Sequence, residues 1–294
     1  MAANWEGKSK GTVFGYKIFI FLLKNLGINA AYALLFFVAF YYTIFSVKST
    51  TSIFYYFRKR LKYSFFKSAI SVFKNYLVFG KTIIDKVAIS SGLRNKYTYN
   101  FDGIENLKNL LKQKKGGILI SAHVGNFEIA DYFLDELAED AKITLLISDA
   151  EHQAIKEYMQ QFFRKSRTKF IIFKEDMSHI FEINSALANN EILCIAGDRF
   201  VKGSKFMKAD FLGKKAKFPA GPFSIASRLN LPVLFVYVMR EKSKHYHLYA
   251  RTAQVKKGNA EDLLHQFTAS VTGILEKYPL QWFNYFDFWE KERL

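Results

Sequence analysis

The run His123-Val124-Gly125-Asn126-Phe127-Glu128 places a carboxylate five residues after an imidazole. A carboxylate beside a histidine can accept a hydrogen bond from one ring nitrogen and fix the tautomer, which leaves the other nitrogen to take a proton. His123 would then act as a general base and Glu128 would orient it, so that an incoming hydroxyl becomes a nucleophile. No separate serine or cysteine nucleophile is apparent, so direct transfer to an acceptor is indicated. On spacing alone, such a pair more often reflects helix capping than catalysis.

The elements around this run predict how the pair is positioned. The apolar stretch 117–122 is entered through glycines and is typical of a strand that ends at His123. Open α/β sheets place their sites at such strand ends. Gly125 and Asn126 break the strand, and Asn126 is a good N-cap for an amphipathic helix over 126–138. We therefore expect Glu128 one turn into that helix, within reach of His123.

The rest of the chain predicts an α/β domain in which helices flank a mixed central sheet. From residue 96 onward, short apolar strands alternate with helical patterns, as expected when a sheet is covered on both faces. We expect strands at 96–101, 117–122, 142–147, 170–173, 191–196, 232–239 and 246–250, and helices at 104–114, 126–138, 151–164, 178–189, 222–229 and 260–278. Residues 51–294 are predicted to form this single catalytic domain.

Residues 1–50 are predicted to be a membrane anchor. The stretch 28–47 carries no charge and is long enough to cross roughly 30 Å of hydrocarbon as a helix. The preceding run 13–23 is interrupted by Lys17 and favours an interfacial helix, although the two could form a re-entrant hairpin. Stretch 52–91 mixes apolar residues at helical spacing with Lys and Arg. It predicts basic amphipathic helices that either rest on anionic headgroups or pack against the domain.

The amino-acid composition limits the classes of partner that the chain is expected to bind. Lys and Arg number 43 against 26 Asp and Glu, giving a formal charge of +17, which calls for a polyanionic partner. Nucleic acid, anionic lipid and acidic carrier protein all qualify, but 31 Phe and 17 Tyr favour lipid and not nucleic acid. The single cysteine, Cys194, excludes an intrachain disulfide and a zinc site built on several cysteines. We predict no metal site.

The string HVGNFE after a Gly-rich strand resembles the His-x4-Asp/Glu motif of the lysophospholipid acyltransferase superfamily. It is most similar to the HxGNFE or HxGNWE form of the bacterial lipid A biosynthesis acyltransferases, the lauroyl and myristoyl transferases. The resemblance runs from the N-terminal anchor to Pro279-Leu280-Gln281-Trp282, which looks like the family's last block. It implies a lysophospholipid-acyltransferase-like domain with His123 as general base and Glu128 as its orienting partner. It also implies an acyl carrier protein or coenzyme A thioester as donor, no further cofactor, and a lipid hydroxyl as acceptor.

Further positions match the same family and suggest substrate-binding residues. Arg167 precedes Asp198 at the spacing the family shows, and Gly197-Asp198-Arg199 resembles its second block. Arg167 and Arg199 are candidates to stabilise an oxyanion or hold a phosphate, and Asp198 either joins them or positions one of the arginines.

The third block, 211–222, is predicted to be a Gly and Pro turn that runs into a helix. Lys217 and Gly221 are its candidates for binding the headgroup phosphate, because a helix N-terminus attracts anions. A plain strand-to-helix turn is the alternative interpretation.

Together these features predict an O-acyltransferase of the lipid A type in the inner membrane, with its catalytic domain facing the cytoplasm. Its expected partners are the lipid acceptor, acyl carrier protein and an anionic membrane surface. The aromatic run 283–289 stands where basic residues commonly follow the last block, and it packs against either the core or the membrane interface. Because of this departure, an aryl-polyene pigment or a glycerolipid is an alternative acceptor. A non-catalytic lipid-binding membrane protein is the alternative from another class.

Overall fold

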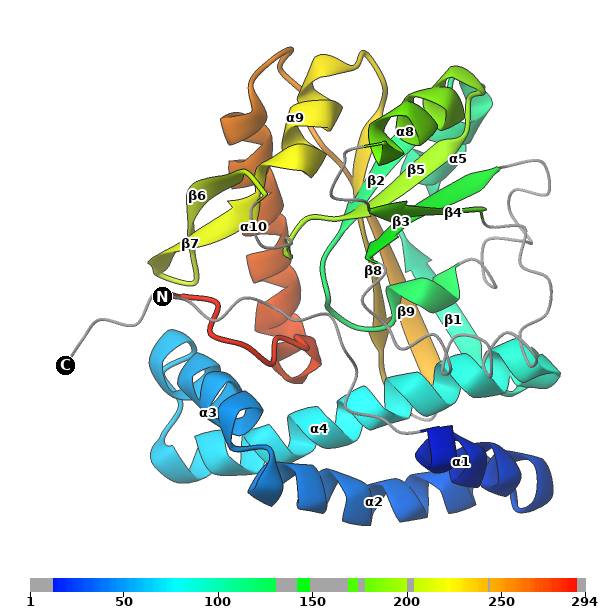
Figure 1. The fold of residues 1–294 in the computed structure, drawn as a ribbon, viewed down its shortest axis with the longest axis vertical. Helices are drawn as coiled ribbons and strands as arrows, with labels where there is room; N and C mark the ends of the chain where they lie inside the picture. Colours follow the sequence, from blue (N-terminus) through cyan, green and yellow to red (C-terminus); the bar gives the residue numbers. More distant parts are fainter. Residues whose placement is uncertain are drawn as a thin grey trace.

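A seven-stranded sheet forms the centre of the computed structural model (Figure 1), which describes residues 13–130, 142–148, 169–173, 178–199, 204–242 and 244–289. In spatial order the strands are β1 (Thr98–Asp102), β9 (His245–Thr252), β8 (Val233–Arg240), β2 (Gly117–Ser121), β5 (Ile192–Ala196), β3 (Ile143–Ser148) and β4 (Lys169–Phe173). The five strands from β8 to β4 run parallel to one another, while β9 is antiparallel to β8 and β1 is parallel to β9. This confirms the mixed α/β sheet.

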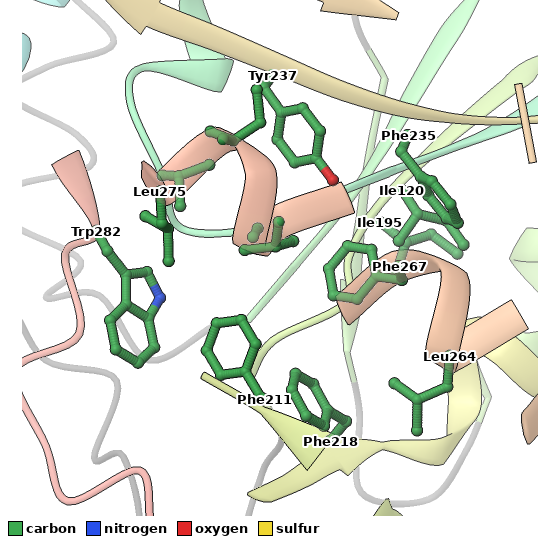
Figure 2. Packing of buried hydrophobic residues seen from close by; sticks show 14 of the residues in the cluster. Ile120, Ile195, Phe211, Phe218, Phe235, Tyr237, Leu264, Phe267, Leu275 and Trp282 are labelled. Atoms are coloured by element: carbon green, nitrogen blue, oxygen red, sulfur yellow. The ribbon is translucent and has the colours of Figure 1, made fainter. Parts of the chain in front are cut away.

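Helices cover the sheet where the sequence pattern predicts them. They are α5 (Ile104–Lys112), α8 (His179–Ala188), α9 (Ala220–Arg228) and α10 (Ala260–Lys277). Every residue of β2 is buried, as expected for a central strand covered on both faces. Figure 2 shows Phe267 of α10 among Ile120, Ile195 and Phe235 of the sheet. The helix predicted over 151–164, and the part of the one over 126–138 beyond residue 130, lie outside the described residues.

Block 211–222 differs from its prediction. In place of a turn that leads directly into a helix, β6 (Phe206–Phe211) and β7 (Lys214–Pro219) form an antiparallel hairpin, and α9 begins only at Ala220. The two turn residues, Leu212 and Gly213, have φ of 50° and 76°. Positive φ at both central positions matches the twist of a two-residue hairpin, which explains why the chain reverses there.

The N-terminal third forms a layer of helices across one end of the sheet (Figure 1). It comprises α1 (Val13–Asn25), α2 (Gly27–Phe45), α3 (Val47–Tyr55), the π-helical turn η1 (Tyr56–Arg60) and α4 (Phe65–Ala88), followed by the π-helical turn η2 (Ile89–Leu93) and the short 3-10 helix η3 (Arg94–Lys96). Helix α2 is long and apolar enough to cross a membrane and is a candidate membrane anchor. It lies very close to α4, because a Cβ added at Gly80 would stand 2.2 Å from the Leu35 side chain.

Candidate active site

His123 and Asp198 meet because the two strands that precede them are neighbours in parallel register. Ser121 of β2 is paired with Ala196 of β5. His123 lies two residues after Ser121, and Asp198 lies two residues after Ala196. The backbone bond from Gly197 N to Ser121 O, 2.7 Å long, extends the pairing beyond the strands. His123 Nδ1 lies 2.7 Å from Asp198 Oδ1, and the His123 backbone N–H donates to Oδ2 at 2.9 Å. The carboxylate therefore holds both the ring and the backbone of His123.

The two members of the pair differ in burial. Asp198 is 4% exposed, whereas the His123 side chain is 33% exposed. Burial and the Arg199 cation lower the pKa of His123 below its ordinary value, against the raising effect of Asp198. Burial would raise the pKa of Asp198, but His123 and Arg199 hold it below its usual value. At neutral pH this arrangement gives an ionised carboxylate beside a neutral imidazole. With the Nδ1 proton donated to Asp198, Nε2 is the ring nitrogen that carries the lone pair.

Arg199 adds a partly buried positive charge next to the pair. Its Nη2 donates to the carbonyl of Phe283 at 2.5 Å, and its guanidinium carbon lies 5.9 Å from the centroid of the Phe286 ring. Burial lowers the pKa of Arg199 to about 10, so the side chain remains protonated at neutral pH. The cation is thus fixed by the chain segment that follows Trp282.

The loop after His123 is pinned against β8 and α4. Gly125 has a φ of +62°, and a Cβ there would stand 2.1 Å from the carbonyl oxygen of Val238, so only glycine fits. The Asn126 backbone N–H donates to Val238 O at 2.7 Å. Asn126 occupies the N-cap position of η4 (Phe127–Ile129), as predicted, but its side chain makes no capping bond. Its amide donates instead to the carbonyl of Thr82 in α4 at 2.9 Å and to the hydroxyl of Tyr246 at 3.3 Å.

The C-terminal block closes over the same loop. Phe283 N donates to His123 O at 3.0 Å, and Gly125 N donates to Gln281 O at 2.9 Å. The Gln281 side chain accepts from Arg240 N at 2.9 Å and donates to Arg240 O at 2.7 Å, which fixes the block to the end of β8. The sequence indicated this block only through resemblance and gave no sign that it clamps the loop carrying His123.

The aromatic run 283–289 packs largely into the core, which was one of its two predicted places. Trp282, Phe288 and Trp289 are 2%, 7% and 3% exposed. The Trp282 ring contacts that of Phe211 in β6 at 5.6 Å between centroids, and Figure 2 shows Phe211 and Phe218 of the hairpin on the side facing Trp282. The hairpin is therefore joined to the site through the C-terminal block.

The other predicted site residues are placed as follows. Lys217 lies in β7 opposite Lys208, and its Nζ is 4.7 Å from the centroid of the Phe206 ring. Gly221 lies in the first turn of α9, where a side chain would meet open space. Arg167 and the side chain of Glu128 lie outside the described residues, so the pairing of Glu128 with His123 stays a prediction. Asp198, which was predicted to bind substrate or position an arginine, contacts the histidine itself.

These features define an α/β protein with a histidine–aspartate pair at the ends of two adjacent parallel strands. The sequence model of the bacterial lipid A biosynthesis acyltransferase family matches residues 70–286, and the chain belongs to that family. No curated protein matches the chain. Family membership makes the protein an acyltransferase, with acyl transfer to a lipid as its class of activity. The match begins inside α4, so α1 to α3 precede it.

Proposed function

We propose that the protein transfers a fatty acyl chain from a thioester of acyl carrier protein or coenzyme A to a hydroxyl of a lipid A precursor. The observation that carries the proposal is the His123 imidazole, which is held through Nδ1 by Asp198 and whose side chain is partly exposed. An imidazole held in this way can act as a general base. The reaction that we propose for it is the acyl transfer of the family to which the chain belongs. The site of action we propose is the inner membrane, with the catalytic domain facing the cytoplasm.

In the proposed reaction the acceptor hydroxyl gives its proton to Nε2 of His123. The hydroxyl oxygen attacks the thioester carbonyl carbon, a C–O bond forms, the C–S bond breaks, and the proton passes to the departing thiolate. Asp198 keeps the imidazole in the productive tautomer and stabilises the imidazolium that forms briefly. A positioned general base contributes roughly 10²- to 10⁴-fold to the rate.

We propose that the remaining candidate residues stabilise or bind negative charge. Arg199 carries a fixed cation beside His123, which suits the oxyanion that develops on the thioester carbonyl. We propose that Arg167, Lys217 and the α9 N-terminus at Gly221 bind the anionic headgroup, and that Glu128 is a second carboxylate acting on His123. The net charge of +17 would draw acidic carrier protein and anionic lipid to the enzyme.

The test is an acyl-transfer assay with the purified full-length chain in lipid vesicles. Donors are acyl carrier protein and coenzyme A thioesters, acceptors are a lipid A precursor and a lysophospholipid, and products are measured by mass spectrometry. We expect an acylated lipid A precursor, and loss of product with His123→Ala. His265→Ala is the matched control, because His265 is exposed on α10.

Two outcomes would count against the proposal at different levels. Product formed by His123→Ala at the rate of the unaltered chain would overturn the mechanism. Product formed only from lysophospholipid would overturn the lipid A acceptor and leave the chemistry standing.

A further inference from the structure

We propose that α2 does not cross the membrane and lies in the plane of one leaflet of an anionic bilayer. It would dock through its outer face, defined as Phe36, Phe37, Phe40, Tyr41, Ile44 and Phe45. The inference rests on the proposed function only in taking a membrane lipid as the acceptor.

Helix α2 has two apolar faces with different surroundings. The inner face is buried in the protein and consists of Ile28, Ala31, Leu35 and Ala39, at helical spacing. The side chains of the outer face are each at least half exposed, from 50% for Phe36 to 69% for Phe37. An exposed stripe of six large apolar side chains indicates a surface that is covered in the working protein.

The inner face is occupied along much of the helix by α4, which runs antiparallel beside it (Figure 1). Near one end, the Tyr32 hydroxyl donates to the Asp85 carboxylate. Towards the other end, the rings of Tyr42 and Tyr76 lie 6.2 Å apart. These contacts lie about 15 Å apart along α2, at about 1.5 Å per residue. Helix α2 is therefore bound side-on to α4 over this length.

Helix α4 is in turn bound to the catalytic unit. The Asn75 amide donates to the carbonyls of Leu280 and Trp282, both at 3.0 Å, and the Thr82 carbonyl accepts from Asn126. If α2 stood across the bilayer, α4 would be drawn into the hydrocarbon with it. Exposed lysines of α4, such as Lys67 and Lys74, would lose their hydration there, which is costly. With α2 in the plane, both helices keep these contacts and α4 stays at the surface.

The charge of this layer specifies what covers it. From residue 13 to residue 84 the sequence contains no Asp or Glu, and every charged side chain is Lys or Arg. Lys48, Arg58, Lys59 and Lys62 are exposed beyond the end of α2. Aromatic side chains settle at the membrane interface, and cations beside them are attracted to anionic headgroups. A bilayer rich in anionic lipid fits both features.

In this orientation the site sits just above the leaflet. The loop that carries His123 rests on α4 through Asn126, and the Phe283 ring packs on that of Phe79 in α4 at 4.9 Å. Only the thickness of the helical layer then separates the catalytic loop from the headgroups.

The test measures the depth of α2 in vesicles by spin-label accessibility. Single cysteines replace Ala33, Phe37, Phe40 and Ile44 in turn, which lie on one side of the helix; the native Cys194 is buried and is replaced by serine. Vesicles contain phosphatidylglycerol and phosphatidylcholine. In-plane docking predicts a similar, shallow depth at all four positions. A depth that changes steadily along the helix, by about 16 Å over eleven residues, would overturn the proposal.

A binding measurement supports the depth profile. Phe37→Ser should weaken binding to anionic vesicles on the order of tenfold, because a buried phenylalanine is lost from the leaflet. Phe181→Ser on α8 is the matched control, since Phe181 is 79% exposed and lies away from the outer face of α2. Equal loss in both variants would contradict docking through this face.

Failure of docking and failure of the proposed function are distinguishable. A depth gradient would leave acyl transfer intact, and an inactive chain with a flat depth profile would leave docking intact.

Discussion

Two buried carboxylates, Asp85 and Asp198, show how similar groups serve different purposes in this molecule. Asp85 is 0% exposed and accepts from Arg240 Nε at 2.8 Å, Tyr246 OH at 2.6 Å and Tyr97 OH at 2.9 Å, as well as from Tyr32. Asp198 is 4% exposed and holds one imidazole through two bonds. Both are satisfied, as buried charges must be.

The difference lies in the partners. Burial opposes the charge of Arg240, but Asp85 holds its pKa above the ordinary value, and burial together with Asp85 raises the pKa values of Tyr97 and Tyr246. These partners keep their protons at neutral pH, so the Asp85 cluster ties α2 and α4 to the sheet. The partner of Asp198 is an imidazole whose pKa burial and Arg199 lower below its ordinary value, and its side chain is partly exposed. A catalytic role is therefore indicated by a titratable and partly exposed partner, and not by a buried carboxylate alone.

The largest expected effect comes from neutralising the Asp198 carboxylate. Asp198→Asn keeps the side-chain size but removes the charge that holds the His123 tautomer, so kcat should fall roughly 10²- to 10⁴-fold. Glu128→Gln measured beside it shows which carboxylate orients the base. A kcat lost with Glu128→Gln and kept with Asp198→Asn would reverse the assignment.

Removing the other carboxylate should affect folding. Asp85→Ala leaves Arg240 buried and unpaired, so the free energy of unfolding should fall by about 3–5 kcal/mol, measured by denaturant titration. Glu105→Ala is the control, because Glu105 forms an exposed ion pair with Lys108 on α5 and should change stability by less than about 0.5 kcal/mol. Similar losses in the two variants would refute the structural role of Asp85.

The loop from His123 to Asn126 joins the two regions, and Gly125 tests that connection. Gly125→Ala would force a Cβ against the Val238 carbonyl and lower both kcat and stability, by about 1–3 kcal/mol for the latter. Gly213→Ala, at φ +76° in open space, carries the backbone strain without the clash. If the two variants have equal kcat and equal melting temperatures, the loop is not held as described.

The smallest expected effect is a shift in pH dependence. His123 must be neutral to act, so kcat/KM should fall as the pH drops through its pKa, which lies below the ordinary value of about 6.5. Arg199→Met removes a cation that lowers this pKa, so the acid limb should move to higher pH. Arg199→Lys keeps the charge and should leave the limb in place. A limb that stays fixed in Arg199→Met would exclude Arg199 as a cause of the lowered pKa.

Local sequence patterns predicted much of the fold and the position of His123, one of the two residues of the pair. Apolar runs located all seven strands of the central sheet, and the break after residue 122 placed His123 at a strand end. Its partner was harder to predict, because Asp198 is 75 residues away and becomes a neighbour only when β5 pairs with β2. The available signal was that both residues lie just after an apolar run, His123 directly after 117–122 and Asp198 two residues after 191–196.

Two other features could not be predicted from the sequence pattern, and each has a physical reason. The run from Lys214 to Lys217 is rich in lysine, so its alternation of exposed and buried residues did not predict a strand. Asp85 lies among lysines in an amphipathic pattern that suggests a solvated face, and only tertiary packing reveals its four donors. The boundary at residue 50 and the roles of Glu128 and Arg167 stay predictions.

Because His123 and Asp198 each stand two residues beyond a strand, their meeting depends on register and not on the length of chain between them. Insertions or deletions in the connections between β2 and β5 would leave the pair in place, which makes those connections suitable for exchange when new acceptors are sought. Deleting Gly197 would instead turn the carboxylate towards the opposite face of the sheet, since side chains alternate along an extended chain. A change of one residue there would cost more activity than a change of ten in a connecting loop.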